Sequence, residues 1–192
     1  IQEGKILAWG MSEPTVEQVR AAHAVTPLAS VQNEYSLMQR RAEQGMLAVC
    51  EELGIGFESY SPLAGGFLSG RYSAASVFTG DDIRRVITRF AKENMIANQP
   101  LLDLLQSVAE AEGCTQAQVA LRWLLKKKPW IVPLCGMRSE RRMEENFSAD
   151  AADLSEESFQ RIEQAISQIE IHGDRKDKDI AQMGTIRTLN IV

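Results

Sequence analysis

Apolar residues recur along the chain in two alternating patterns: short unbroken runs, and runs spaced every three or four positions. The short runs are bounded by glycine or proline and predict buried strands. They cover residues 6–9, 28–32, 55–60 and 130–134. The spaced runs predict amphipathic helices between and after these strands. The chain is therefore expected to alternate strand and helix four times.

Several of the predicted helices begin with polar residues whose side chains can accept hydrogen bonds from the free backbone amides of the first turn. Thr15 with Gln18, and Thr115 with Gln118, have the spacing of capping boxes. Helices are expected to begin at Thr15, at Thr115 and at Ser155. Three others are expected to cover residues 40–53, to include residues 101–108 and to cover residues 139–147. The polar stretch from Gly65 to about Glu93 is long enough to be a functional lid or binding loop.

Alternating strands and helices predict a parallel sheet with helical crossovers. One form is a small open, doubly wound sheet, although no GxGxxG fingerprint follows the first strand. The other is a (β/α)8 barrel, which four strands cannot close and whose open edges would be prone to aggregation. Periodicity alone leaves both forms open. With no linker or low-complexity segment, residues 1–192 are expected to form a single domain, with 173–192 as a charged surface tail.

Composition narrows the class of protein. The 192 residues are 44% hydrophobic and 24% charged, as in ordinary soluble domains, and the net charge of −5 argues against a nucleic-acid partner. The apolar runs are far shorter than the roughly 20 residues that cross a membrane, and the first residues do not resemble a signal peptide. Cys50, Cys114 and Cys135 have no metal-ligand spacing, so we expect reduced thiols, no metal site and a cytoplasmic protein.

Four stretches at the strand ends carry a more specific signal. They are residues 4–13 (GKILAWGMSE), 31–37 (VQNEYSL), 60–70 (YSPLAGGFLSG) and 132–138 (VPLCGMR), the last followed by Glu145 and Asn146. In order and spacing they resemble strands five to eight of the aldo-keto reductases, over residues 4 to about 170. Residues 81–85 (DDIRR) are similar to the branch of soluble bacterial-type reductases. The resemblance implies a parallel (β/α)8 TIM barrel, of which this chain supplies about the C-terminal half.

The resemblance also implies an NADP site at the carboxyl ends of the strands. Gln32, helped by Ser12, would bind the nicotinamide carboxamide, and Tyr60 would stack on the ring. The pyrophosphate path would be lined by Ser61, Leu63, Gly66 and Leu68. The adenosine side would be formed by Gly136, Met137, Arg138, Arg142, Glu145 and Asn146, with the two arginines favouring the 2′-phosphate of NADP over NAD.

The same residues have simpler interpretations. Tyr60 ends an apolar strand, where an aromatic side chain is commonly part of the core or its rim. Arg138 and Arg142 alternate with glutamates, as on a solvated helix face. These interpretations stay open at the level of sequence.

Aldo-keto reductases transfer a hydride from the nicotinamide to an aldehyde or ketone, and a tyrosine donates the proton. In the family this tyrosine and its lysine, aspartate and histidine partners come from the first four strands. Tyr35, Tyr60 and Tyr72 do not match its motif, so no catalytic residue is assigned. The main hypothesis is an NADP(H)-dependent reductase whose N-terminal half is the partner of this chain, which would be inactive alone. The alternatives are a non-catalytic nucleotide-binding or regulatory subunit, and a self-associating half-barrel.

Overall fold

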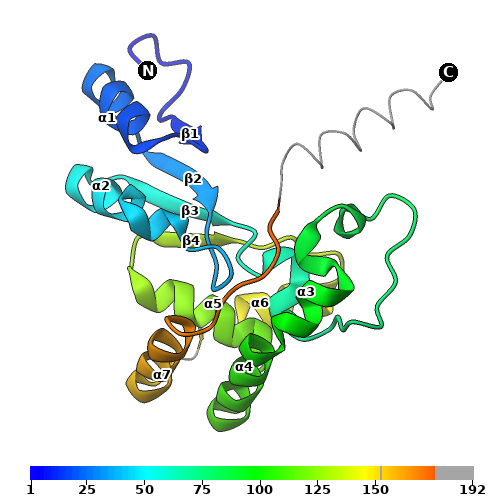
Figure 1. The fold of residues 1–192 in the computed structure, drawn as a ribbon. Helices are drawn as coiled ribbons and strands as arrows, with labels where there is room; N and C mark the ends of the chain where they lie inside the picture. Colours follow the sequence, from blue (N-terminus) through cyan, green and yellow to red (C-terminus); the bar gives the residue numbers. More distant parts are fainter. Residues whose placement is uncertain (152, 176–192) are drawn as a thin grey trace, which may run out of the picture.

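The computed structural model describes residues 1–151 and 153–175. Within them, a parallel sheet contains β1 (Gly10–Ser12), β2 (Ser30–Glu34), β3 (Gly56–Tyr60) and β4 (Ile131–Leu134), in the order β1-β2-β3-β4 (Figure 1). The predicted parallel α/β arrangement is therefore confirmed. The strand order runs in one direction without the reversal of a doubly wound sheet, so the described strands follow one another as neighbouring strands of a barrel do.

Helices connect and cover these strands. They are α1 (Val16–Val25), α2 (Met46–Leu53), α3 (Lys92–Ala97), α4 (Gln99–Glu112), α5 (Gln116–Lys127), α6 (Glu140–Phe147) and α7 (Glu156–Ile166). Both expected capping boxes are present, at Thr15 and at Thr115. The helices expected at residues 139 and 155 begin after the serine caps Ser139 and Ser155.

The Thr115 cap gives a first testable expectation. Replacing Thr115 with alanine is expected to lower the free energy of unfolding by about 1 kcal/mol, because the backbone N–H of Gln118 loses its acceptor, the Thr115 hydroxyl, at the start of α5. Urea denaturation measures this loss. Thr115→Ser is the matched control, since it keeps the hydroxyl; an equal loss in both variants would contradict the capping role.

The two faces of the sheet differ in polarity. Met11, Val31, Phe57 and Ile131 stand in register across the four strands, and the last three are buried. The neighbouring row on the other face is Ser12, Gln32, Glu58 and Val132, which is half-buried or exposed. The apolar row belongs to the main core, to which Tyr35 and the fully buried Trp123 of α5 contribute. Side chains on the polar row have no comparable apolar covering among the described residues.

Two expected elements were placed wrongly. The apolar run at residues 6–9 is not a buried strand: Ile6 and Leu7 are exposed, and β1 begins at Gly10. This segment precedes β1; its Trp9 packs against the core, while Ile6 and Leu7 lie on the surface. The helix expected over residues 40–53 is interrupted at Gly45, whose φ of 126° separates a 3-10 turn at Arg41–Gln44 from α2.

The long segment after β3 folds mainly as turns. Its 3-10 turns are Ala64–Ser69, Ile83–Arg85 and Thr88–Phe90, and α3 follows. Tyr72, Phe78 and Phe90 pack edge to face within this segment. The predicted surface tail begins at Gly173, which is exposed, while Asp174 and Arg175 are half-buried; residues 176–192 of that tail lie outside the described residues.

Candidate cofactor site

A cavity of about 760 Å³ opens beyond the carboxyl ends of β3 and β4. Its volume is within the range of small-molecule and cofactor sites. Nine residues predicted from the sequence line it together: Tyr60, Ser61, Leu63, Gly66, Gly136, Met137, Arg138, Arg142 and Asn146. They come from segments more than 60 residues apart, which the parallel pairing of β3 with β4 brings to one edge of the sheet.

Four predicted residues do not line this cavity. Ser12 and Gln32 are register partners on β1 and β2, and the Gln32 amide donates to Glu58 at 3.0 Å. Leu68 is fully buried in the core. Glu145 is held by an ion pair with Arg142. Their proposed contacts with a cofactor therefore remain predictions.

The loop after β3 has the backbone conformation of a tight cradle. Gly65 and Gly66 have φ of 71° and 92°, and Ser61 and Ala64 adopt the left-handed region at 51° and 52°. A Cβ at Gly66 would lie 3.1 Å from the Tyr72 ring, so both conformation and space favour glycine there. Left-handed conformations in residues with side chains are strained and commonly concentrate at functional sites.

The structure adds two arginines that the sequence analysis missed. Arg71 and Arg84 line the same cavity as Arg138 and Arg142. Arg84 Nε donates to the Gly65 carbonyl at 3.0 Å, and its guanidinium lies 4.6 Å from the Tyr72 ring centroid. Arg84 thereby ties the long segment to the glycine cradle. The available signal was the DDIRR motif, but spacing alone does not bring it to the cradle.

The helix α6 contributes the second wall of the cavity. Ser139 accepts from the Arg142 backbone amide at the helix start, and Arg142 pairs with Glu145 on the same helix. Arg141 is exposed and does not line the cavity. Four guanidinium groups around one cavity favour an anionic ligand with several charges, such as a phosphorylated nucleotide.

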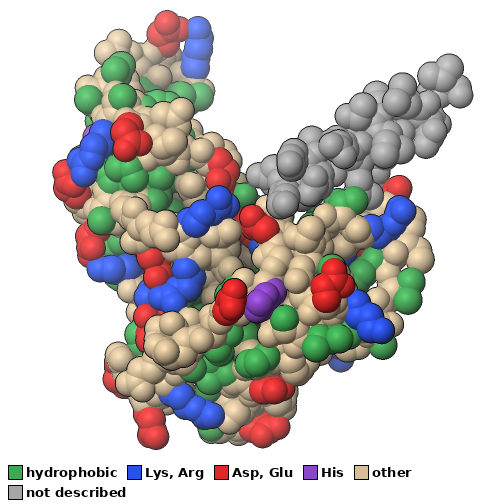
Figure 2. Space-filling model, viewed as in Figure 1, with side chains coloured by type: hydrophobic (Ala, Val, Ile, Leu, Met, Phe, Trp, Pro, Cys, Tyr) green, Lys and Arg blue, Asp and Glu red, His purple; other side chains and the backbone are tan. Residues whose placement is uncertain are grey.

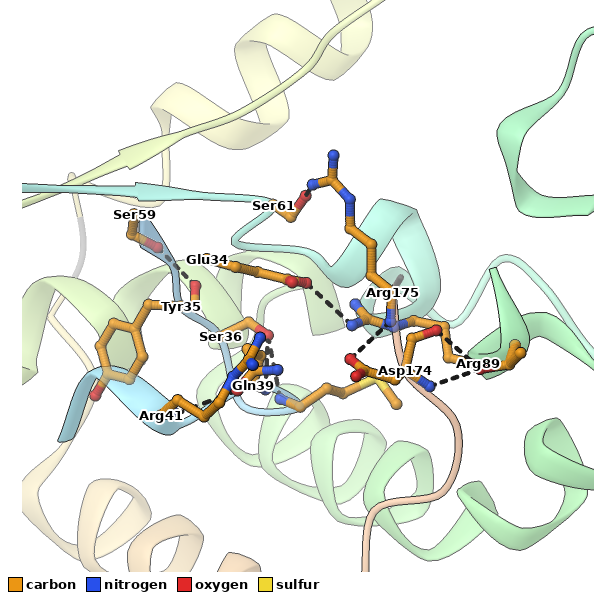
Figure 3. A network of polar contacts seen from close by, with 12 residues as sticks. Glu34, Tyr35, Ser36, Gln39, Arg41, Ser59, Ser61, Arg89, Asp174 and Arg175 are labelled. Atoms are coloured by element: carbon orange, nitrogen blue, oxygen red, sulfur yellow. Dashed lines mark hydrogen bonds and ion pairs between the residues drawn. The ribbon is translucent and has the colours of Figure 1, made fainter. Parts of the chain in front are cut away.

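A cluster of charged residues lies beside Tyr60 at the ends of β1–β3. Glu34 and Arg89 form an ion pair of 3.0 Å whose side chains are 4% and 3% exposed, and Glu13 Oε1 accepts from the Glu34 amide at 2.9 Å. Burial raises the pKa of Glu34, although Arg89 opposes this. Burial, reinforced by Glu13, also raises the pKa of Tyr60, so its hydroxyl stays protonated. Figure 3 shows Glu34 directed from the end of its strand toward Arg89.

Other ligands find less support in the described part of the chain. There, no group of three or more His, Cys, Asp or Glu residues is arranged to hold a metal ion. None of the helices there has the length and apolar character needed to cross a bilayer. On the face drawn in Figure 2, basic and acidic side chains are intermixed and form no broad patch of one sign.

Comparison with known proteins identifies the class. Residues 1–167 match the model of the aldo/keto reductase family, and the chain belongs to that family. It is 34% identical over 175 residues to a probable aldo-keto reductase 1 of Glycine max, covering 91% of this chain and 50% of that protein. It is 36% identical over 178 residues to the aldo-keto reductase yakc [NADP(+)] of Schizosaccharomyces pombe, covering 91% and 52%.

Solved structures agree with this assignment. A glycerol dehydrogenase from Gluconobacter oxydans superposes with a TM-score of 0.81 at 26% identity, over 89% of this chain and 52% of that one. A thermostable aldo-keto reductase, Tm1743, has the same fold, with a TM-score of 0.63 at 23% identity over 85% and 50%. The chain spans about half the length of the curated relatives that it matches.

Proposed function

We propose that this chain is the cofactor-binding, C-terminal half of an NADP(H)-dependent reductase that acts on an aldehyde or ketone. The observation that carries the proposal is the cavity lined by Arg71, Arg84, Arg138 and Arg142 together with the glycine cradle. Family membership supplies the reaction class, and one relative carries NADP(+) in its name.

The residues present fit such a dinucleotide. The glycines at 65 and 66 let the backbone come close to a pyrophosphate. Elsewhere in the lining of the cavity, a Cβ added at Gly136 would meet no atom within 4 Å, so there is space for a ligand beside this residue. Arg138 and Arg142 would bind the 2′-phosphate, with Met137, Glu145 and Asn146 on the adenosine side. Ser61, Leu63 and Gly66, which line the cavity, would follow the pyrophosphate.

At the nicotinamide end, Tyr60 would provide a flat stacking surface and remain protonated because of its raised pKa. Gln32 and Ser12, in register on neighbouring strands, would orient the carboxamide. The bound cofactor would supply the hydride for carbonyl reduction. The proton donor and its partners are expected in the N-terminal half, so we assign no catalytic residue to this chain.

The sheet supports the proposal of a half-barrel. A parallel sheet is normally buried on both faces, yet the row from Ser12 to Val132 is half-buried or exposed. Within the described residues, β1 and β4 also have one unpaired edge each. An N-terminal half with four further strands would pair with both edges and enclose the polar face. We also propose a single domain in the cytoplasm, where its cysteines stay reduced.

The test is to measure carbonyl-dependent oxidation of NADPH by the full-length protein. In parallel, the coding sequence before Ile1 is determined, to see whether it encodes the catalytic tyrosine, lysine and aspartate of the family. We expect oxidation by the full-length protein and none by residues 1–192 alone. NADPH binding without those residues or oxidation would identify a nucleotide-binding or regulatory subunit instead. Elution of residues 1–192 as a stable dimer would favour a self-associating half-barrel. A full-length protein that neither binds nor oxidises NADPH contradicts the proposal.

A further inference from the structure

The segment after α7 returns to the carboxyl end of the sheet and is fixed there. We call residues 171–175 the strap; it passes between the sheet and α3 (Figure 1). The fully buried Asn98 makes two bonds to the His172 backbone: its amide donates to the carbonyl at 2.8 Å, and its oxygen accepts from the amide at 2.9 Å. These reciprocal bonds fix the strap three residues before Arg175.

A second pair of bonds fixes the end of the strap. The Thr88 hydroxyl donates to the Asp174 carbonyl at 3.0 Å and accepts from the Asp174 amide at 2.8 Å. Between the two anchors, Gly173 has φ of 77°, and a Cβ there would lie 2.6 Å from Arg89 Cα. The strap therefore has a defined path, which determines where the next side chain can reach.

That side chain is Arg175, and it lies on Tyr60, at the proposed nicotinamide end, and on Ser61, where the proposed pyrophosphate path begins. Its guanidinium carbon is 4.9 Å from the Tyr60 ring centroid, and Nη1 donates to Ser61 Oγ at 2.9 Å. Figure 3 shows the side chain extending from the strap to Ser61 at the end of β3. A planar cation on an aromatic face uses the same stacking surface that a nicotinamide ring would use.

We propose that Arg175 is an internal competitor of the cofactor, which must leave Tyr60 and Ser61 when the nicotinamide end binds. The proposal rests on the proposed function of Tyr60. Cofactor entry would then be coupled to the strap, because Thr88 and Asn98 hold Arg175 in place. The cation–π contact with Tyr60 and the hydrogen bond to Ser61 are each weak enough to be displaced. They lower the apparent affinity for the cofactor in proportion to the fraction of molecules in which this surface is covered.

The sign of the effect separates this proposal from simple electrostatics. Removing a cation beside an anionic dinucleotide would ordinarily weaken binding, whereas removing a competitor strengthens it. Arg175→Ala is therefore expected to lower the Kd for NADPH roughly three- to tenfold in the full-length protein. Thr88→Val, which removes one of the two anchors of the strap but keeps the guanidinium, is expected to give a smaller change in the same direction.

A second ligand tests the location. Adenosine 2′,5′-bisphosphate has no nicotinamide, so its Kd is expected to be the same for native protein and Arg175→Ala. Arg161→Ala is the matched charge control, because it removes an exposed cation on α7 that is bonded to Ser107. Its Kd values for both ligands are expected to equal those of the native protein. Titration calorimetry gives each Kd, and circular dichroism verifies folding.

The outcomes distinguish the two proposals. Tighter NADPH binding by Arg175→Ala, with unchanged binding of the bisphosphate, supports the competitor. Unchanged or weaker NADPH binding overturns it while leaving the proposed cofactor site intact. If native protein and variant bind neither ligand, the proposed function itself fails. Tightening of both ligands alike would also overturn a competitor confined to Tyr60 and Ser61.

Discussion

Replacing Arg89 with methionine is expected to lower the free energy of unfolding by about 3–5 kcal/mol. The variant would leave the Glu34 carboxylate, 4% exposed in its side chain, without the cation that now lies 3.0 Å away. A buried charge without a partner is much less stable than the same charge in water. Urea denaturation at neutral pH measures the change.

The matched control is the exposed ion pair between Arg20 and Glu52 on the surface. Arg20→Met is expected to leave the free energy of unfolding nearly unchanged, because solvent replaces the lost partner. Equal effects of Arg89→Met and Arg20→Met would contradict a structural role for the buried pair.

The pH dependence of Arg89→Met follows from Glu34. Burial raises the pKa of Glu34 in the folded state, so the folded protein binds more protons than the unfolded chain between the two pKa values. Stability from this group is therefore greatest below its unfolded pKa and is lost as pH rises through the folded pKa. Without Arg89 the folded pKa should rise further, and the cost of the substitution should decrease on acidification. A cost independent of pH would mean that Glu34 is not the group responsible.

The second large effect concerns the choice between NADP and NAD. The variant with both Arg138→Ala and Arg142→Ala is expected to weaken NADPH binding roughly 100-fold or more, because each hydrogen bond from a charged group contributes about 1.5–3 kcal/mol. NADH lacks the 2′-phosphate, so its weaker binding should change little. Fluorescence titration with both cofactors measures the ratio.

Arg141 is the control for this variant. It lies next to Arg142 on α6 and carries the same charge, but it is exposed and outside the cavity. Arg141→Ala is expected to leave both affinities nearly unchanged. If Arg141→Ala weakens NADPH binding as much as the double variant does, the general positive charge of this region, rather than a specific phosphate site, would account for the preference for NADPH over NADH.

Much of the fold could be predicted because its signals are local. Thr15 and Thr115 cap helices through residues three positions away, and the serines at 139 and 155 do the same. Strand positions were less well predicted, since an apolar run becomes a strand only where a neighbour pairs with it. In the described sheet the register of β1 begins at Gly10, opposite Ser30, and Leu7, which precedes it, is exposed.

The candidate site could be predicted in part for a related reason. Tyr60, Ser61 and Arg138 belong to motifs at strand ends, and parallel pairing brings such ends together. Arg71 and Arg84 belong to the turn-rich segment after β3, and their approach to the cavity depends on how that segment packs. No spacing rule predicts the bond from Arg84 to Gly65, 19 residues earlier.

The sequence by itself determined the alternation of strands and helices, the helix caps and the family motifs, because each depends on neighbouring residues. Only the tertiary structure decided that Arg89 pairs with Glu34 across 55 residues and that Arg175 reaches Ser61 across 114. Long-range contacts of this kind form only after the sheet and its connections have fixed the path of the backbone. The strand-end motifs are therefore a property of the sequence, and the charged residues around Tyr60 are a property of the fold.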